Sequence, residues 1–193
     1  NCAAIVSIYG DPTGLIFKTN TIGTKNVLEA CIRKGVKRLI HFSSVHAVIE
    51  SMQNLPFTEN LPYKTKDHNA YDYSKAVGEQ LLLNRQPTHS VEIVILRPSA
   101  VVGPFDFKPS PMGKALLDFY NQKIPVLAEG GFDFVDVEDV ARTAIAAIDN
   151  GRSGEIYLLS GKYYSLLELS QIIHKITSKN VPKLVIPYQL LKI

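Results

Sequence analysis

The chain has 193 residues, of which 46% are hydrophobic and 20% charged, a composition typical of a folded domain with a core of its own. Its net charge is only +3, and its densest basic run, "RKGVKR" at 33–38, is more typical of a solvated corner than of a nucleic-acid patch. No apolar stretch approaches the ~20 residues of a membrane span, and the 2 cysteines provide neither a metal-binding spacing nor a disulfide framework. We therefore expect a cytoplasmic protein with no nucleic-acid partner, no membrane partner and no metal site.

Strand-like and helix-like segments alternate along the chain, which predicts an α/β fold built on a parallel sheet. The apolar run at 91–98 is typical of a strand that is covered on both faces. Asp136 stands where an N-cap would precede the amphipathic segment 137–151. In chain order, we expect a strand at 2–8, a helix at 19–35, a strand at 36–42, a helix at 70–82, a strand at 91–98, a helix at 115–121, a strand at 132–137, a helix at 137–151, a strand at 155–161 and a helix at 165–179.

The segment "AYDYSKAVGEQLL" at 70–82 contains two tyrosines close to one lysine. Tyr71 precedes Lys75 by four residues, and positions four apart share one face of a helix, so these two side chains can act together on one small molecule. Tyr73 precedes Lys75 by only two residues and points elsewhere. We expect the mostly apolar face that includes this second tyrosine to be the buried one: Tyr73, Ala76, Val77, Gln80 and Leu81.

An ordered series of short motifs runs through the chain: "CAA", "GTKNVLEA", "HFSS", "YDYSK", "LRPSAVVGP", "FDFVDVEDVA" and "GEIYLLSG". In this order they resemble the extended short-chain dehydrogenase/reductases, also called the NAD-dependent epimerase/dehydratase family, and most of all its dihydroflavonol-4-reductase-like branch. The resemblance implies a Rossmann-type doubly wound parallel sheet with a small C-terminal substrate lobe, formed by roughly 104–131 and 162–193.

The sequence contains no G-x-G-x-x-G or G-x-x-G-x-x-G segment, although a glycine-rich turn normally binds the pyrophosphate of a dinucleotide in such folds. The resemblance begins at what would be the fourth strand. We therefore interpret residues 1–193 as one incomplete NAD(P)-binding domain, and we expect the gene to encode a glycine-rich strand, turn and helix before Asn1.

The resemblance implies three catalytic residues, Ser44, Tyr71 and Lys75. A hydride transfer to or from a carbonyl carbon requires a proton transfer at the oxygen, and a phenol can carry it if a nearby ammonium lowers its pKa from about 10. A serine hydroxyl at a strand end can hold the substrate oxygen, and the alignment favours Ser44 over Ser43 for this role. The structural alternatives are a surface tyrosine stacked on a lysine stem and two serines that simply end a strand.

The resemblance also implies which residues contact the cofactor, NAD or NADP: Ala3, Ala4, Ser43, Tyr71, Lys75, Pro98, Ser99, Ala100 and Val101. Ordinary strand packing explains the two alanines equally well. Asn20 suits either a polar network at the active site or an N-cap. Gly78 suits close helix packing, and His46, two residues after Ser44, suits either a substrate contact or a solvated turn.

The expected activity is the NAD(P)-dependent transfer of a hydride between nicotinamide and a ketone, an aldehyde or a secondary alcohol. A nucleotide-sugar epimerase or dehydratase and a 3β-hydroxysteroid dehydrogenase share the same residues and remain alternatives. A non-catalytic dinucleotide sensor or scaffold is an alternative of another class. The expected partner is a small carbonyl or alcohol substrate, with a possible homodimer through helices at 20–34 and 71–84 by analogy with the family.

Overall fold

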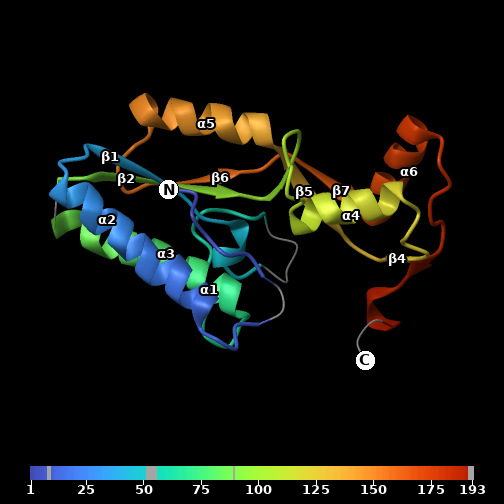
Figure 1. Cartoon of the computed structure of the whole chain (residues 1–193), viewed down its shortest axis with the longest axis horizontal. Helices are drawn as coiled ribbons and strands as arrows, with labels where there is room; N and C mark the ends of the chain where they lie inside the picture. Colours follow the sequence, from blue (N-terminus) through green and yellow to red (C-terminus); the bar gives the residue numbers. More distant parts are fainter. Residues whose placement is uncertain (8–9, 51–55, 89, 191–193) are drawn as a thin grey trace. The chain divides into compact units, whose positions relative to one another are not determined.

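The computed structural model describes residues 1–7, 10–50, 56–88 and 90–190, which belong to two compact units (Figure 1). The first unit comprises Asn1–Pro98 and Ala141–Leu159. The second unit comprises Ser99–Val140 and Ser160–Ile193. Within the described ranges, no helix is both long enough and apolar enough to cross a bilayer.

The first unit contains a parallel sheet with the strand order β1-β2-β6. These strands are β1 (Arg38–Phe42), β2 (Glu92–Pro98) and β6 (Ile156–Leu159). The helical elements of this unit are α1 (Leu15–Phe17), the π-helical η1 (Lys18–Ile22), α2 (Gly23–Arg33), the 3-10 turns η2 (Val45–Ala47) and η3 (Gln86–Thr88), α3 (Ala70–Arg85), and α5 (Val137–Asn150) from Ala141 onward.

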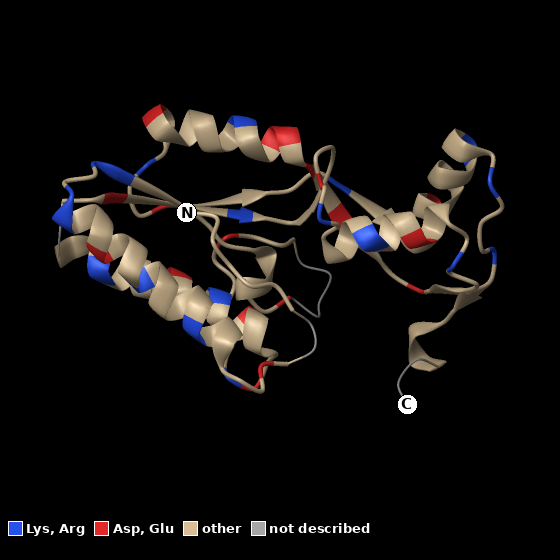
Figure 2. Cartoon of the chain, in the orientation of Figure 1, with Lys and Arg blue, Asp and Glu red and all other residues tan. Residues whose placement is uncertain are grey.

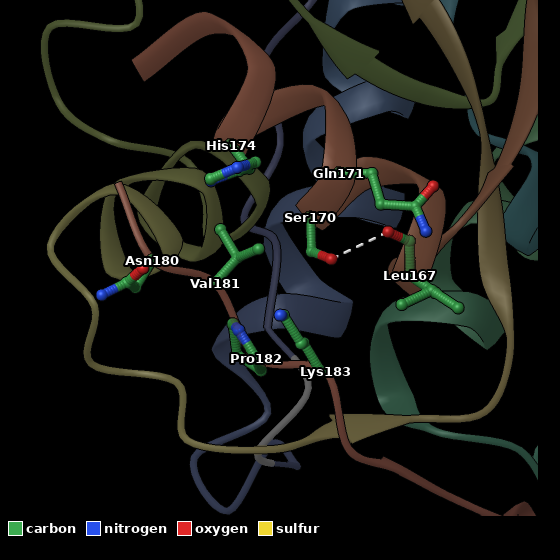
Figure 3. Close-up of a pocket in the computed structure, with 8 residues that line it drawn as sticks. All are labelled: Leu167, Ser170, Gln171, His174, Asn180, Val181, Pro182 and Lys183. Atoms are coloured by element: carbon green, nitrogen blue, oxygen red, sulfur yellow. Dashed lines mark hydrogen bonds between the residues drawn. The ribbon is translucent and has the colours of Figure 1, made fainter. Parts of the chain in front are cut away.

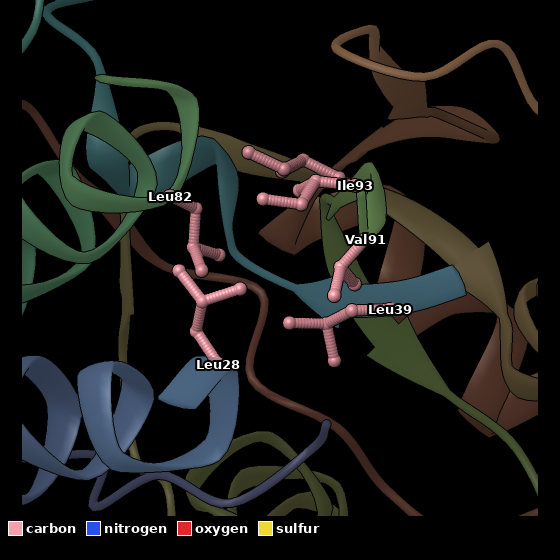
Figure 4. Close-up of a cluster of buried hydrophobic side chains, with 6 residues drawn as sticks. Leu28, Leu39, Leu82, Val91 and Ile93 are labelled. Atoms are coloured by element: carbon pink, nitrogen blue, oxygen red, sulfur yellow. The ribbon is translucent and has the colours of Figure 1, made fainter. Parts of the chain in front are cut away.

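Helices cover both faces of this sheet, α2 and α3 on one side and α5 on the other (Figure 1). The core between the sheet and the first pair of helices is a cluster of aliphatic side chains (Figure 4): Leu28, Leu39, Leu82, Val91, Ile93 and Ile95. On the opposite face Val94 is fully buried, and the guanidinium of Arg38 donates to the carbonyl oxygen of Ala147 on α5 at 2.9 Å. The two-sided burial predicted for 91–98 is therefore confirmed.

The second unit contains a mixed sheet in the order β3-β5-β7. β5 (Gly131–Asp136) pairs in parallel with β3 (Ala100–Val102) and antiparallel with β7 (Lys162–Ser165). A second pair joins β4 (Leu127–Ala128) to β8 (Val185–Ile186). The helices are α4 (Pro111–Tyr120), α6 (Leu166–Thr177) and the 3-10 turn η4 (Tyr188–Leu190). α6 begins with a capping box in which Ser165 and Glu168 bond each other's backbone N–H, which fixes its first turn.

Several predicted elements differ from the structure. Residues 2–7 form no strand, and residue 8 of that prediction lies outside the described ranges. Asn1 instead hydrogen-bonds β1, through its carbonyl oxygen to the N–H of Phe42 at 3.0 Å. The helix predicted at 115–121 starts earlier, at Pro111, because the Ser110 hydroxyl caps it by accepting from the N–H of Gly113 at 3.0 Å.

The amphipathic stripe predicted for 137–151 is only partly buried. Val140 and Ala147 are buried, but Ile145 and Ile148 are 67% and 56% exposed. The Asp136 cap is confirmed, because its carboxylate accepts from the N–H of Glu138 at 2.8 Å. The short strands β3, β4, β7 and β8 were not predicted, since two to four residues are too few to show a period.

Candidate active site

Tyr71 and Ser44 meet at the carboxyl end of β1. Ser44 lies two residues after Phe42, the last residue of that strand, and its hydroxyl caps the 3-10 turn by accepting from the N–H of His46 at 3.2 Å. Tyr71 lies in the first turn of α3, which Asn69 caps by accepting from the N–H of Asp72 at 2.9 Å. The Ser44 side chain interacts with the phenol of Tyr71 and lowers its pKa. Two residues that are 27 positions apart in sequence (71 minus 44) are thus joined where parallel α/β sheets bind ligands.

Lys75 lies one turn further along α3 and is only 5% exposed. Its ammonium donates to the backbone carbonyl oxygen of Phe42, the last residue of β1, at 2.8 Å. Burial lowers the pKa of Lys75 to about 8, against the opposing charge of Glu79. Lys75 therefore stands beside the strand end that carries the serines, with a proton that it can release near neutral pH.

Tyr71 is held protonated by its surroundings. Burial raises the pKa of the Tyr71 phenol, the interaction with Ser44 lowers it, and the negative charge of Asp72 raises it further. The net direction is upward, so the side chain is a proton donor at neutral pH. A phenol that donates and a serine hydroxyl beside it together provide two donors for one ligand oxygen.

The prediction of the buried face of α3 was wrong. Tyr73, Val77, Gln80 and Leu81 are only partly buried, and Tyr73 stacks on Phe17 at a centroid distance of 5.5 Å. The residues that the core encloses are largely polar and lie on the side of Lys75: Asp72, Ser74, Lys75, Ala76, Gly78, Glu79 and Leu82. Polar side chains tolerate this burial because each finds a partner inside the fold, which an apolar pattern does not reveal.

Asn20 is one of these interior partners and is 3% exposed. Its side chain accepts from the N–H of Ile5 at 2.8 Å, donates to the carbonyl oxygen of Ile5 at 3.0 Å, and donates to the Ser74 hydroxyl at 2.9 Å. Since it lies inside η1, it is no N-cap and belongs to the polar network instead. Gly78 sits opposite, where an added Cβ would lie 3.2 Å from the carbonyl oxygen of Asn20, so glycine allows this close approach.

The residues expected at the cofactor are spread over both units. Ala3 is exposed and Ala4 partly buried, and both lie before α1 in the first unit with Ser43 and Pro98. Ser43 is 6% exposed, and its buried hydroxyl has no hydrogen-bond partner among the described residues. Ser99, Ala100 and Val101 belong to the second unit, where the Ser99 hydroxyl is likewise buried without such a partner.

A charged cluster beside Tyr71 was not predicted. Asp72 is 4% exposed, and Lys64 Nζ lies 2.6 Å from its Oδ2 while His46 Nδ1 lies 3.2 Å from its Oδ1. Burial opposes ionisation of Asp72, but its interactions with His46 and Lys64 outweigh it and hold its pKa below the usual value. The only sequence signal was the helix-start position of Asp72, which is common to many solvated helices.

A second ion pair fastens α3 to β2. Arg97 and Glu79 are both 0% exposed, and the guanidinium donates to Glu79 Oε2 at 2.6 Å and to Oε1 at 3.2 Å. Arg97 also donates to the carbonyl oxygen of Glu59 at 3.0 Å, and the Glu59 carboxylate accepts from the N–H of Leu158 at 3.1 Å. This network connects α3, the segment before it and the parallel sheet, and so holds in place the helix that carries Tyr71 and Lys75.

Among the described residues, Lys and Arg are spread over several elements of each unit (Figure 2). A pocket of about 410 Å³ lies in the second unit between α6 and the segment 180–183 (Figure 3). Its lining includes Leu167, His174 and Lys183, which lie in the segment 162–193 expected to belong to the substrate lobe, and none of the individually predicted site residues.

The parallel sheet β1-β2-β6, with helices on both faces, defines an α/β protein with a Rossmann-type sheet. Residues 1–160 match the family described as "NAD dependent epimerase/dehydratase family". The chain belongs to this family, and the Rossmann-type fold predicted from its motifs is confirmed.

Two relatives show the range of similar proteins. The chain is 32% identical to "Sterol demethylase protein B" from Methylococcus capsulatus over 98% of this chain and 58% of that protein. It is 30% identical to "Putative dihydroflavonol 4-reductase" from Synechocystis sp. over 96% of this chain and 55% of that protein. The chain therefore spans a little over half the length of these relatives.

Solved structures agree on the fold. The crystal structure of gox2253 superposes with a TM-score of 0.87 at 30% identity, covering 97% of this chain and 58% of the other. The RMD structure from Pseudomonas aeruginosa complexed with NADPH has a TM-score of 0.79 at 22% identity, covering 96% of this chain and 67% of the other. A dTDP-glucose 4,6-dehydratase (rfbB) from Bacillus anthracis in complex with NAD has a TM-score of 0.77 at 21% identity, covering 95% of this chain and 59% of the other.

Proposed function

We propose that the protein is an NAD(P)-dependent oxidoreductase that transfers a hydride between nicotinamide and a ketone, an aldehyde or a secondary alcohol. The observation that carries this proposal is the placement of Ser44 and Tyr71 near the carboxyl end of β1, where the buried ammonium of Lys75 donates to the Phe42 carbonyl oxygen. Membership of the NAD-dependent epimerase/dehydratase family supports the same conclusion.

In the reducing direction, a carbonyl oxygen accepts hydrogen bonds from the Ser44 hydroxyl and the Tyr71 phenol. When bound, the nicotinamide supplies the hydride to the carbonyl carbon. Tyr71 gives its proton to the oxygen as negative charge develops there, and Ser44 stabilises that charge. In the oxidising direction Tyr71, as phenolate, takes the hydroxyl proton instead.

Lys75 makes the oxidising direction possible, in which Tyr71 acts as a phenolate. Burial and Asp72 favour the neutral phenol of Tyr71, so the phenolate needs a nearby positive charge. An ammonium one helical turn away supplies that charge, and the same group can donate to a ribose hydroxyl and orient the ring. Replacing its present contact with the Phe42 carbonyl oxygen requires only a rotation of a flexible side chain.

The residues of the site fit a bound dinucleotide. The buried Ser43 hydroxyl has no hydrogen-bond partner among the described residues, and a ligand that bonds it removes this cost. We assign the cofactor contacts to Ala3, Ala4, Ser43, Tyr71, Lys75, Pro98, Ser99, Ala100 and Val101. Segments 104–131 and 162–193 of the second unit form the substrate lobe in this proposal. The protein acts in the cytoplasm on a small carbonyl or alcohol, and a homodimer through α2 and α3 follows by family analogy.

A nicotinamide absorbance assay on the complete protein tests the function. The substrate panel contains simple ketones, a dihydroflavonol, nucleotide sugars and 3-hydroxysterols, the last because similar proteins include "Sterol-4-alpha-carboxylate 3-dehydrogenase, decarboxylating" from Homo sapiens. We expect oxidation or reduction of nicotinamide with at least one carbonyl or alcohol, and none in Lys75→Met. Cofactor binding with no turnover across the panel would favour a dinucleotide sensor, and interconversion of sugars without net redox would favour an epimerase.

A further inference from the structure

The carboxylate of Asp72 joins three segments that surround Tyr71. It belongs to α3, while Lys64 comes from the segment that precedes the helix and His46 from the turn after β1. The two partner segments are also bonded to each other, since the N–H of Lys64 donates to the carbonyl oxygen of Ala47 at 3.0 Å. A single buried carboxylate thus holds the turn that carries Ser44 against the helix that carries Tyr71.

The cluster extends to the Tyr71 ring itself. His46 packs edge-on against that ring at a centroid distance of 5.9 Å and an interplanar angle of 62°. The His46 side chain is 52% exposed, whereas those of Lys64 and Asp72 are 11% and 6% exposed. The charges of Lys64 and Asp72 are therefore poorly screened by water and act strongly on a neighbour.

We propose that Asp72 is a positioning residue that, through Lys64 and His46, fixes Tyr71 against Ser44 and sets the pH range in which Tyr71 gives up its proton. The consequence for turnover depends on the function proposed above, whereas the effect on Tyr71 does not. Nothing in the motif "YDYSK" assigns this role, because the residue after the tyrosine varies freely in a bare Y-x-x-x-K pattern.

The two buried charges act on Tyr71 in opposite directions. Asp72 disfavours the phenolate, and Lys64 balances Asp72, so removing either one shifts the proton equilibrium the opposite way. A purely structural contact predicts no such opposition. The other groups that face this equilibrium are Ser44 and His46 on the turn, Lys75 on the helix, and His41 and Cys2 beside Lys75.

A titration of Tyr71 in the complete protein tests the proposal without any need for turnover. The ultraviolet absorbance of tyrosinate is followed against pH, and the curve of the matching Tyr71→Phe protein is subtracted to isolate one side chain. We expect Asp72→Asn to lower the midpoint by roughly one pH unit and Asp72→Glu to restore most of it. Asp67→Asn is the matched control, because Asp67 precedes the same helix but is exposed, and its loss should leave the midpoint unchanged. An unchanged or raised midpoint in a folded Asp72→Asn protein overturns the proposal.

Kinetics near neutral pH give a second readout. In the alcohol-oxidising direction the phenolate is the active form, so we expect the acidic limb of kcat to move to lower pH in Asp72→Asn and to higher pH in Lys64→Met, with the KM for nucleotide unchanged. Shifts in the same direction for both variants would overturn the proposal, and a shift to lower pH in Lys64→Met would overturn it even if Asp72→Asn proved unstable. If the wild-type protein turns over no substrate, the function proposed above fails, and the titration still decides the role of Asp72.

Discussion

Helix α3 contains two buried carboxylates, Asp72 in its first turn and Glu79 near its middle, and their partners differ in exposure. Glu79 is 0% exposed and pairs with an arginine that is also 0% exposed, so this pair is closed to water. Asp72 is almost as buried, but one of its partners, His46, is half exposed and touches Tyr71. Burial of charge alone therefore does not mark a functional group. What distinguishes the two is whether the partners lead to the surface or back into the core.

The same contrast separates the two tyrosines of the helix. Tyr71 lies in the first turn of α3 and interacts with Ser44, whereas Tyr73 stacks on Phe17. Removal of a single hydroxyl should therefore cost far more activity at Tyr71 than at Tyr73.

The largest effect is expected for Tyr71→Phe, which removes one hydroxyl and keeps the ring. Turnover should fall by about 10² to 10⁴-fold, because the proton donor is lost, while cofactor binding and the melting temperature persist. Tyr73→Phe is the control and should stay within a few-fold of wild type. Steady-state kinetics and melting curves measure both, and an active, folded Tyr71→Phe protein would show that the wrong tyrosine has been named.

For the buried pair of Glu79 and Arg97, the expected effect is a loss of stability. Glu79→Ala leaves the Arg97 guanidinium buried without its carboxylate and should lower the free energy of unfolding by about 3–5 kcal/mol. A Glu79→Leu, Arg97→Met double variant removes both charges and should recover most of this loss. Denaturant unfolding measures all three proteins. A Glu79→Ala protein as stable as wild type would mean that water or another group reaches Arg97.

The serines at the end of β1 test the register of the site. Ser44→Ala removes a donor to the developing negative charge and should lower kcat on the order of 10²-fold. Ser43→Ala should cost less in kcat and act mainly on the KM for nucleotide, because the Ser43 hydroxyl has no partner among the described residues. Kinetics on the two variants decide between the serines, and a larger kcat loss in Ser43→Ala would mean that Ser43, and not Ser44, stabilises the developing charge.

The smallest effect is a pH dependence of stability that comes from His41, a residue of β1. Burial first, and then the charge of Lys75, lower the pKa of His41 to about 3 from 6.5. The unfolded chain therefore binds a proton below pH 6.5 that the folded protein does not take up until about pH 3. As the pH is lowered through that window, the free energy of unfolding should fall by about 1.4 kcal/mol for each pH unit. Unfolding curves at pH 7 and 5.5 test this, and His41→Gln should remove the difference.

The candidate site shows how far sequence reasoning reaches. Tyr71 and Lys75 could be paired from their four-residue spacing on a helix, whereas the catalytic roles, and the choice of Ser44 over Ser43, came from the resemblance to a known family. The structure places Ser44 and Tyr71 close enough for the Ser44 side chain to lower the pKa of the phenol. Asn20 remained ambiguous in the sequence, because its partners Ile5 and Ser74 come from segments 15 and 54 residues away.

Local chemistry in the sequence determined the alternation of strands and helices, the covered strand at 91–98 and the capped starts of α5 and α6, since each depends on neighbours within a few residues. Only the tertiary structure decided which face of α3 is buried, because that face is lined by charges whose partners lie elsewhere: Arg97 on β2, Lys64 before the helix and His46 after β1. A prediction from apolar residues assumes that charged side chains stay in water, because burying a lone charge costs free energy. It cannot show that an opposite charge from a distant segment removes this cost once the chain folds.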